Sequence, residues 1–114
     1  MRKIITVTDR SIIELGFVGD DRSTVVRFPI STITSRYGAG GTFELLSKPP
    51  EADAAHKVDD ITQDGLFVEW TVGIEELTKF GKGQAQLVYT DGEGKAHRKI
   101  WETVINRSLI KSSN

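Results

Sequence analysis

The residues from Leu66 to Asn106 read LFVEWTVGIEELTKFGKGQAQLVYTDGEGKAHRKIWETVIN, and they carry the clearest structural signal in the chain. At the start of this stretch apolar residues alternate with Phe67, Glu69 and Thr71. A period of two is typical of a β-strand with one face in a hydrophobic core. The core-facing side chains of this strand are expected to be Leu66, Val68, Trp70 and Val72.

Two longer strands are predicted next, over residues 84–90 and 96–105, joined by a short turn. The turn is the sequence DGEG at residues 91–94, in which glycine adopts positive φ angles at little cost. The core-facing residues of the first of these strands are expected to be Ala85, Leu87 and Tyr89. The acidic segment between the first two strands, residues 73–79, is too short to form a stable helix of its own.

Upstream residues predict further short strands. They lie at residues 3–8, 12–17, 24–30, 42–47 and 56–59. Pro29 has no backbone N–H to donate, so it places the end of strand 24–30 at a sheet edge or a bulge. Residues 31–41 are expected to form a loop, and residues 51–55 an exposed connection. The core is predicted to form around Trp70, with contributions from Phe28, Leu66, Val68, Leu87 and Tyr89.

This pattern of about seven or eight short strands, with turn signals between them, is typical of a β-sandwich or a small barrel. We favour an all-β, immunoglobulin-like antiparallel β-sandwich with Trp70 as its central aromatic residue. The chain has 114 residues, which suits one domain. We expect that domain to cover residues 1–110, with a flexible tail at residues 111–114.

Composition excludes several classes of protein. Of the residues, 38% are apolar and 27% are charged, as in an ordinary globular domain. The net charge of −1 argues against a nucleic-acid partner, because such proteins present a basic face. No apolar run approaches the roughly 18 residues of a membrane-spanning helix. The N-terminal apolar run is broken at once by Thr6, Thr8 and Asp9, so no signal peptide is expected and the protein is predicted to be made in a cytoplasm.

The search for catalytic chemistry is negative. The chain has no cysteine and two histidines, His56 and His97, neither of which has a partner at metal-ligand spacing. The paired acids Asp20-Asp21 and Asp59-Asp60 are best explained as solvated turn residues, since neighbours in a strand point to opposite faces. We therefore expect no catalytic residue, no cofactor and no metal, and we predict that the protein is not an enzyme.

Three aromatic residues are candidates for an interface or a ligand surface: Tyr37, Phe80 and Trp101. The position of Trp101 depends on the register of the last strand. Either Ile100 and Val104 face the core, or Trp101 does, because a shift of one residue turns every side chain to the other face. Large aromatic residues are mostly buried, which favours Trp101 in the core, but the alternation leaves both registers open.

Several short motifs resemble one known family. They are LGFVGDD at 15–21, VRF at 26–28, LLSKPP at 45–50, WTV at 70–72, GKGQAQL at 81–87, TV at 103–104 and SL at 108–109. Together they resemble the N-terminal β-sandwich domains of phage baseplate upper proteins and of related head-fibre or minor structural proteins from phages of Gram-positive hosts. Family members continue into a helical stem and a distal domain. The resemblance thus implies that these residues are either part of a longer chain or a free-standing variant.

Two functions follow as hypotheses. The resemblance implies a virion assembly module, built in the bacterial host cytoplasm, whose partners are copies of itself and other virion proteins. The alternative is a free-standing module that binds a carbohydrate or a cell surface, with a host glycan as its partner. No nucleic acid or membrane partner is expected in either case. Residues 3–8 are the expected edge strand for association, guarded by Arg2 and Lys3.

Overall fold

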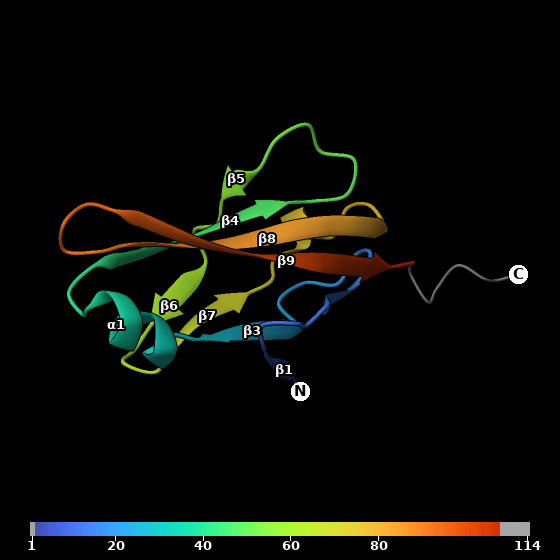
Figure 1. Cartoon of the computed structure of the whole chain (residues 1–114). Coiled ribbons are helices and arrows are strands. Elements are labelled where there is room, and N and C mark those ends of the chain that lie inside the picture. Colours follow the sequence, from blue (N-terminus) through green and yellow to red (C-terminus); the bar gives the residue numbers. More distant parts are fainter. Residues whose placement is uncertain (1, 108–114) are drawn as a thin grey trace, which may run out of the picture.

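The computed structural model describes residues 2–107, and within them the chain forms two β-sheets that pack face to face (Figure 1). The elements of this part are β1 (Lys3–Thr6), β2 (Ile13–Phe17), β3 (Thr24–Pro29), α1 (Ser31–Tyr37), β4 (Thr42–Lys48), β5 (His56–Lys57), β6 (Ile61–Gln63), β7 (Phe67–Thr71), a 3-10 turn (Ile74–Glu76), β8 (Gly81–Thr90) and β9 (Ala96–Asn106). The predicted all-β sandwich is confirmed. The expected tail at residues 111–114 lies outside the described residues.

Each sheet is mixed rather than purely antiparallel. One has four strands in the order β1-β3-β7-β6, and the other has five in the order β2-β9-β8-β4-β5. Pairing is antiparallel except for β1 with β3 and β2 with β9, which are parallel. The expectation of antiparallel pairing throughout is therefore wrong at these two edges. Neither pair is joined by a hairpin, and only a hairpin obliges neighbouring strands to run in opposite directions.

The core between the sheets is centred on Trp70, as predicted. Its side chain is 1% exposed, and those of Phe28 and Tyr89 are equally buried. Leu66, however, is 62% exposed, so its expected place in the core is wrong. Strand β7 begins one residue later, and the backbone N–H of Leu66 donates to Asp64 Oδ1 at 2.7 Å. Leu66 belongs to this turn, where the alternation of the strand does not yet apply.

Residues 31–41 are not a loop throughout, because Ser31–Tyr37 forms the short helix α1. Seven residues are too few for a helix that is stable alone, so tertiary packing must hold it. Ile33, 7% exposed, anchors the helix to the core. Helix α1 closes one end of the sandwich (Figure 1). Gly38 ends the helix with a φ of 92°, which glycine adopts without strain.

The register of the last strand is resolved by the hairpin. Strand β8 pairs with β9 so that Ala85 lies opposite Trp101, and residues directly opposite each other share a face of the sheet. Because Ala85 is buried, Trp101 is buried too, at 6% exposure, whereas Ile100 is 58% exposed. The core therefore holds Trp101, as the tendency of aromatic residues favoured.

Candidate functional site

The three aromatic candidates do not form one site. Trp101 is in the core, so its ring takes no part in an exposed surface. Tyr37 and Phe80 are exposed, but they lie at opposite ends of the sandwich. Phe80 precedes the ten-residue strand β8, whereas Tyr37 stacks beside the far end of that strand. A strand of that length spans about 30 Å, so no single ligand of ordinary size contacts both.

Tyr37 is held within the molecule rather than presented to a partner. Its ring stacks on the imidazole of His97, with centroids 3.6 Å apart and an interplanar angle of 15°. His97 Nε2 in turn lies 2.9 Å from Asp91 Oδ2 in the turn between β8 and β9. The hydrogen bonds from His97 and from the backbone N–H of Lys95 keep the pKa of the Asp91 carboxyl below its ordinary value. This cluster fastens helix α1 to the β8–β9 hairpin.

Phe80 is the more exposed of the two candidates, at 50%. The guanidinium of Arg107 lies 4.4 Å from the centroid of its ring, which is cation–π geometry. One face of the ring is therefore covered by a cation. Ile74, 49% exposed, is a further apolar side chain in the segment just before Phe80.

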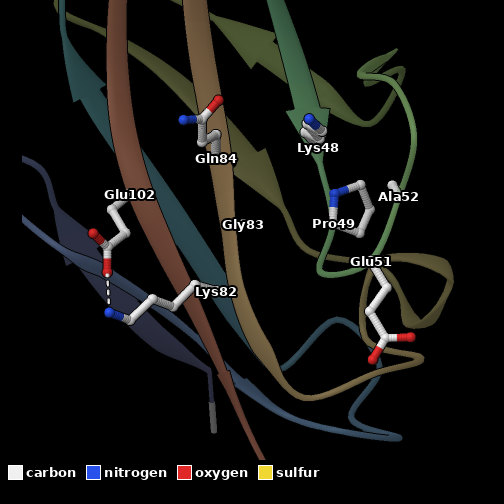
Figure 2. Close-up of a pocket in the computed structure, with 8 residues that line it drawn as sticks. All are labelled: Lys48, Pro49, Glu51, Ala52, Lys82, Gly83, Gln84 and Glu102. Carbon is white, nitrogen blue, oxygen red and sulfur yellow. Dashed lines mark ion pairs between the residues drawn. The ribbon is translucent and has the colours of Figure 1, made fainter.

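A groove of about 420 Å³ lies at the end of the five-stranded sheet where β4 leaves it (Figure 2). Its lining residues are Lys48, Pro49, Glu51, Ala52, Lys82, Gly83, Gln84 and Glu102. Strand pairing explains the polar row across it, because Gln84 lies opposite both Lys48 on β4 and Glu102 on β9. The Nζ of Lys82 is 3.7 Å from Glu102 Oε2. The sequence showed no sign of this groove, since its charges come together only after the strands pair.

Gly83 gives the groove its shape. A Cβ on this residue would lie 2.4 Å from the carbonyl oxygen of Lys48 and 3.0 Å from Thr103 Oγ1. A real side chain cannot occupy that space without moving the backbone of β4. The motif GKG at 81–83, which resembles a phosphate loop only superficially, therefore has a packing role in β8.

A buried acid was also missed by sequence reasoning. The side chain of Glu76 is 3% exposed, and it accepts hydrogen bonds from Ser47 Oγ at 2.7 Å and from His56 Nε2 at 2.5 Å. Burying a carboxylate is costly unless hydrogen-bond donors surround it. The two donors come from β4 and β5, so this acid ties the 3-10 turn to the edge of the five-stranded sheet. No local pattern could have shown the contact, which joins residues 29 and 20 positions apart.

The described residues hold little that suggests a metal or a membrane. Within residues 2–107, no three histidine, cysteine, aspartate or glutamate side chains come together in a way that would hold a metal ion. In the same range, no helix has the length and apolar character needed to cross a bilayer.

Among known structures, the fold is similar to that of a phage protein domain. No family model matches the chain. The fold is that of the N-terminal domain of phage TP901-1 ORF48, with a TM-score of 0.54 and 11% sequence identity, over 92% of this chain and 98% of that one. In sequence, 64 residues are 39% identical to a segment of the mitochondrial arginine biosynthesis bifunctional protein ArgJ from Cryptococcus neoformans. That match covers 56% of this chain and 13% of the length of ArgJ, which is too little of the enzyme to assign its activity to this chain.

Proposed function

We propose that this chain, which folds as the N-terminal domain of phage TP901-1 ORF48 does, is a structural domain of a phage virion that acts through association with other proteins. The observation that carries the proposal is the extent of the structural match, which takes in almost the whole of both domains. The motifs between Leu15 and Leu109 support it independently, because they resemble baseplate and head-fibre proteins. Its partners are other virion proteins and copies of itself, its location is the virion, and assembly takes place in the host cytoplasm.

The described surface gives more support to protein association than to the carbohydrate alternative. Sugar-binding sites of β-sandwiches commonly present an open aromatic ring, onto which a sugar stacks. In residues 2–107, the polar groove has no aromatic lining, Tyr37 is stacked on His97, and Phe80 is covered on one face by Arg107. We propose equally that the domain catalyses no reaction and needs no cofactor. The support is that no three histidine, cysteine, aspartate or glutamate side chains in that range are placed to hold a metal ion, and that the acid Glu76 is buried between Ser47 and His56 in a structural contact.

Purified particles test this proposal. Virions produced by the genome that encodes the chain would be purified, washed at high salt and analysed by mass spectrometry, with immunogold labelling to locate the chain. We expect the chain in a fixed ratio to the other tail proteins and labelling at one part of the particle. Its absence from washed particles would overturn the proposal. Binding of the purified protein to a glycan array, together with that absence, would establish the carbohydrate-binding alternative.

A further inference from the structure

Strand β1 leaves one side of its backbone open. It forms an edge of the four-stranded sheet and pairs in parallel with β3. The N–H of Lys3 donates to the carbonyl of Ser23 at 2.8 Å, and the N–H of Val7 donates to that of Arg27 at 2.9 Å. Alternate residues of a strand direct their backbone groups to opposite sides, so those of Ile4 and Thr6 face away from β3. Within residues 2–107, no strand pairs with β1 on that side.

Charged side chains guard only the start of this edge, at Arg2 and Lys3. Ile4 is 61% exposed although its partner on β3, Val25, is buried at 7% exposure, and Thr6 is also exposed. Exposed edges of this kind are templates for pairing unless short strands, charges or bulges blunt them. The opposite edge of the same sheet is β6, which has only three residues. The edge at β1, with four residues, is slightly longer.

We propose that β1 pairs antiparallel with β1 of a second copy, about a two-fold axis that passes through Ile5. In this register Ile4 lies opposite Thr6 of the second copy, and Thr6 lies opposite its Ile4. Each is a hydrogen-bonded pair. The backbone N–H and carbonyl groups of Ile4 and Thr6, which face the open side of the strand, therefore all find partners in the second copy. The two sheets then form one continuous eight-stranded sheet.

The charges of the strand suit a second copy. In the proposed register, Lys3 lies opposite Val7 of the other chain, and the two Lys3 residues are about 13 Å apart at 3.3 Å per residue. Arg2 lies opposite Thr8 of the second copy, next to its Asp9. That carboxylate pairs with Lys99 of its own chain at 2.8 Å but is 81% exposed, so an anion still lies near Arg2 at both ends. An isologous interface needs a surface that complements itself, and this register provides one. The inference deepens the proposed association by naming one partner, a copy of the same chain.

A single introduced cysteine tests both the pairing and its register, because the chain has no cysteine of its own. The two copies of Ile5 would form a non-hydrogen-bonded pair with Cα atoms about 4.5 Å apart, within disulfide reach. Purified Ile5→Cys protein, oxidised with glutathione disulfide, is expected to form a covalent dimer about tenfold faster than the matched control Lys3→Cys, whose copies lie too far apart. No dimer from Ile5→Cys, or equal rates for the two variants, would overturn the proposal.

Light scattering at high protein concentration is the second measurement, since the loss of Ile5 could disturb folding. Thr6→Pro removes an N–H from the open side alone, and proline is tolerated at sheet edges. Gln63→Pro is the matched control, because it alters the outward side of β6. We expect a dimer for the natural chain and for Gln63→Pro, and a monomer for Thr6→Pro and for Ile4→Lys. Equal association of all four proteins, or a monomeric natural chain, would contradict the pairing. These experiments use purified protein, so they can fail while the chain is still found in virions.

Discussion

The indole N–H of Trp101 donates a hydrogen bond of 2.8 Å to the backbone carbonyl of Thr8, 93 positions earlier in the chain. The same ring packs against Phe28 of the other sheet, with centroids 5.0 Å apart. One side chain of β9 thus joins both sheets and fastens the segment that follows β1. The residue is an internal support of the sandwich rather than a binding surface.

Trp101→Phe should lower the free energy of unfolding by about 1–2 kcal/mol, because it removes the hydrogen bond to Thr8 and part of the ring. Urea unfolding followed by circular dichroism measures this loss. Ile100→Ala on the exposed face of the same strand is the control, expected to cost under about 0.5 kcal/mol. Equal costs for the two variants would mean that the hydrogen bond contributes nothing.

Trp70→Ala should cost on the order of 3–5 kcal/mol, since it leaves a large cavity at the centre of the core. That is a large share of the 5–15 kcal/mol typical of a domain. The matched control is Phe80→Ala, which removes a half-exposed ring. If denaturant melts of Trp70→Ala show a loss below about 1 kcal/mol, the range of surface changes, Trp70 does not anchor the core.

Gly83→Ala should destabilise the fold by about 1–3 kcal/mol, because the added Cβ would lie 2.4 Å from the carbonyl oxygen of Lys48 and displace β4. Gly92→Ala in the β8–β9 turn provides the comparison, since its Cβ would meet no atom within 4 Å. Thermal melts of the two variants check the prediction. A Gly83→Ala protein as stable as Gly92→Ala would show that the backbone at the groove can yield.

Asp91→Asn should reduce stability near neutral pH and have a smaller effect in acid. In the folded protein the pKa of Asp91 lies below its ordinary value, first because of the hydrogen bond from His97. A lowered carboxyl pKa contributes stability that is present above the unfolded value and is lost as the pH falls through the lower folded one. Urea unfolding from pH 7 to pH 2 measures the difference, and Asp53→Asn controls for the loss of an exposed carboxylate. If the difference in unfolding free energy between Asp91→Asn and the natural protein stays constant over this pH range, the ionised Asp91 carboxylate does not stabilise the fold.

Thermal melts with and without a chelator should superimpose, as expected for a protein that binds no metal. A metal held only by the folded state would raise the melting temperature, and a chelator would then lower it. Calcium and zinc added back to the chelated protein provide the converse measurement. A clear fall of the melting temperature with chelator, reversed by either ion, would establish a metal site and contradict the prediction.

Local patterns were sufficient for most strands. Trp70 and Val68 were placed in the core by alternation, and β7, β8 and β9 lie close to their expected positions, because a period of two is a property of neighbouring residues. Helix α1 was missed, since its seven residues are held by the burial of Ile33 and not by helical propensity. Leu66 was misplaced because alternation does not mark the residue at which a strand begins.

The residues alone established a small all-β sandwich with no recognisable catalytic chemistry, because strand period, turn residues and composition are all local properties. Tertiary pairing established the rest: the burial of Trp101, the parallel edges, the buried acid Glu76 with its two donors, and the groove over Gly83. Each of these depends on which distant strands lie side by side and in what register. Alternation cannot supply that information, because a shift of one residue in pairing moves every side chain to the opposite face of the sheet.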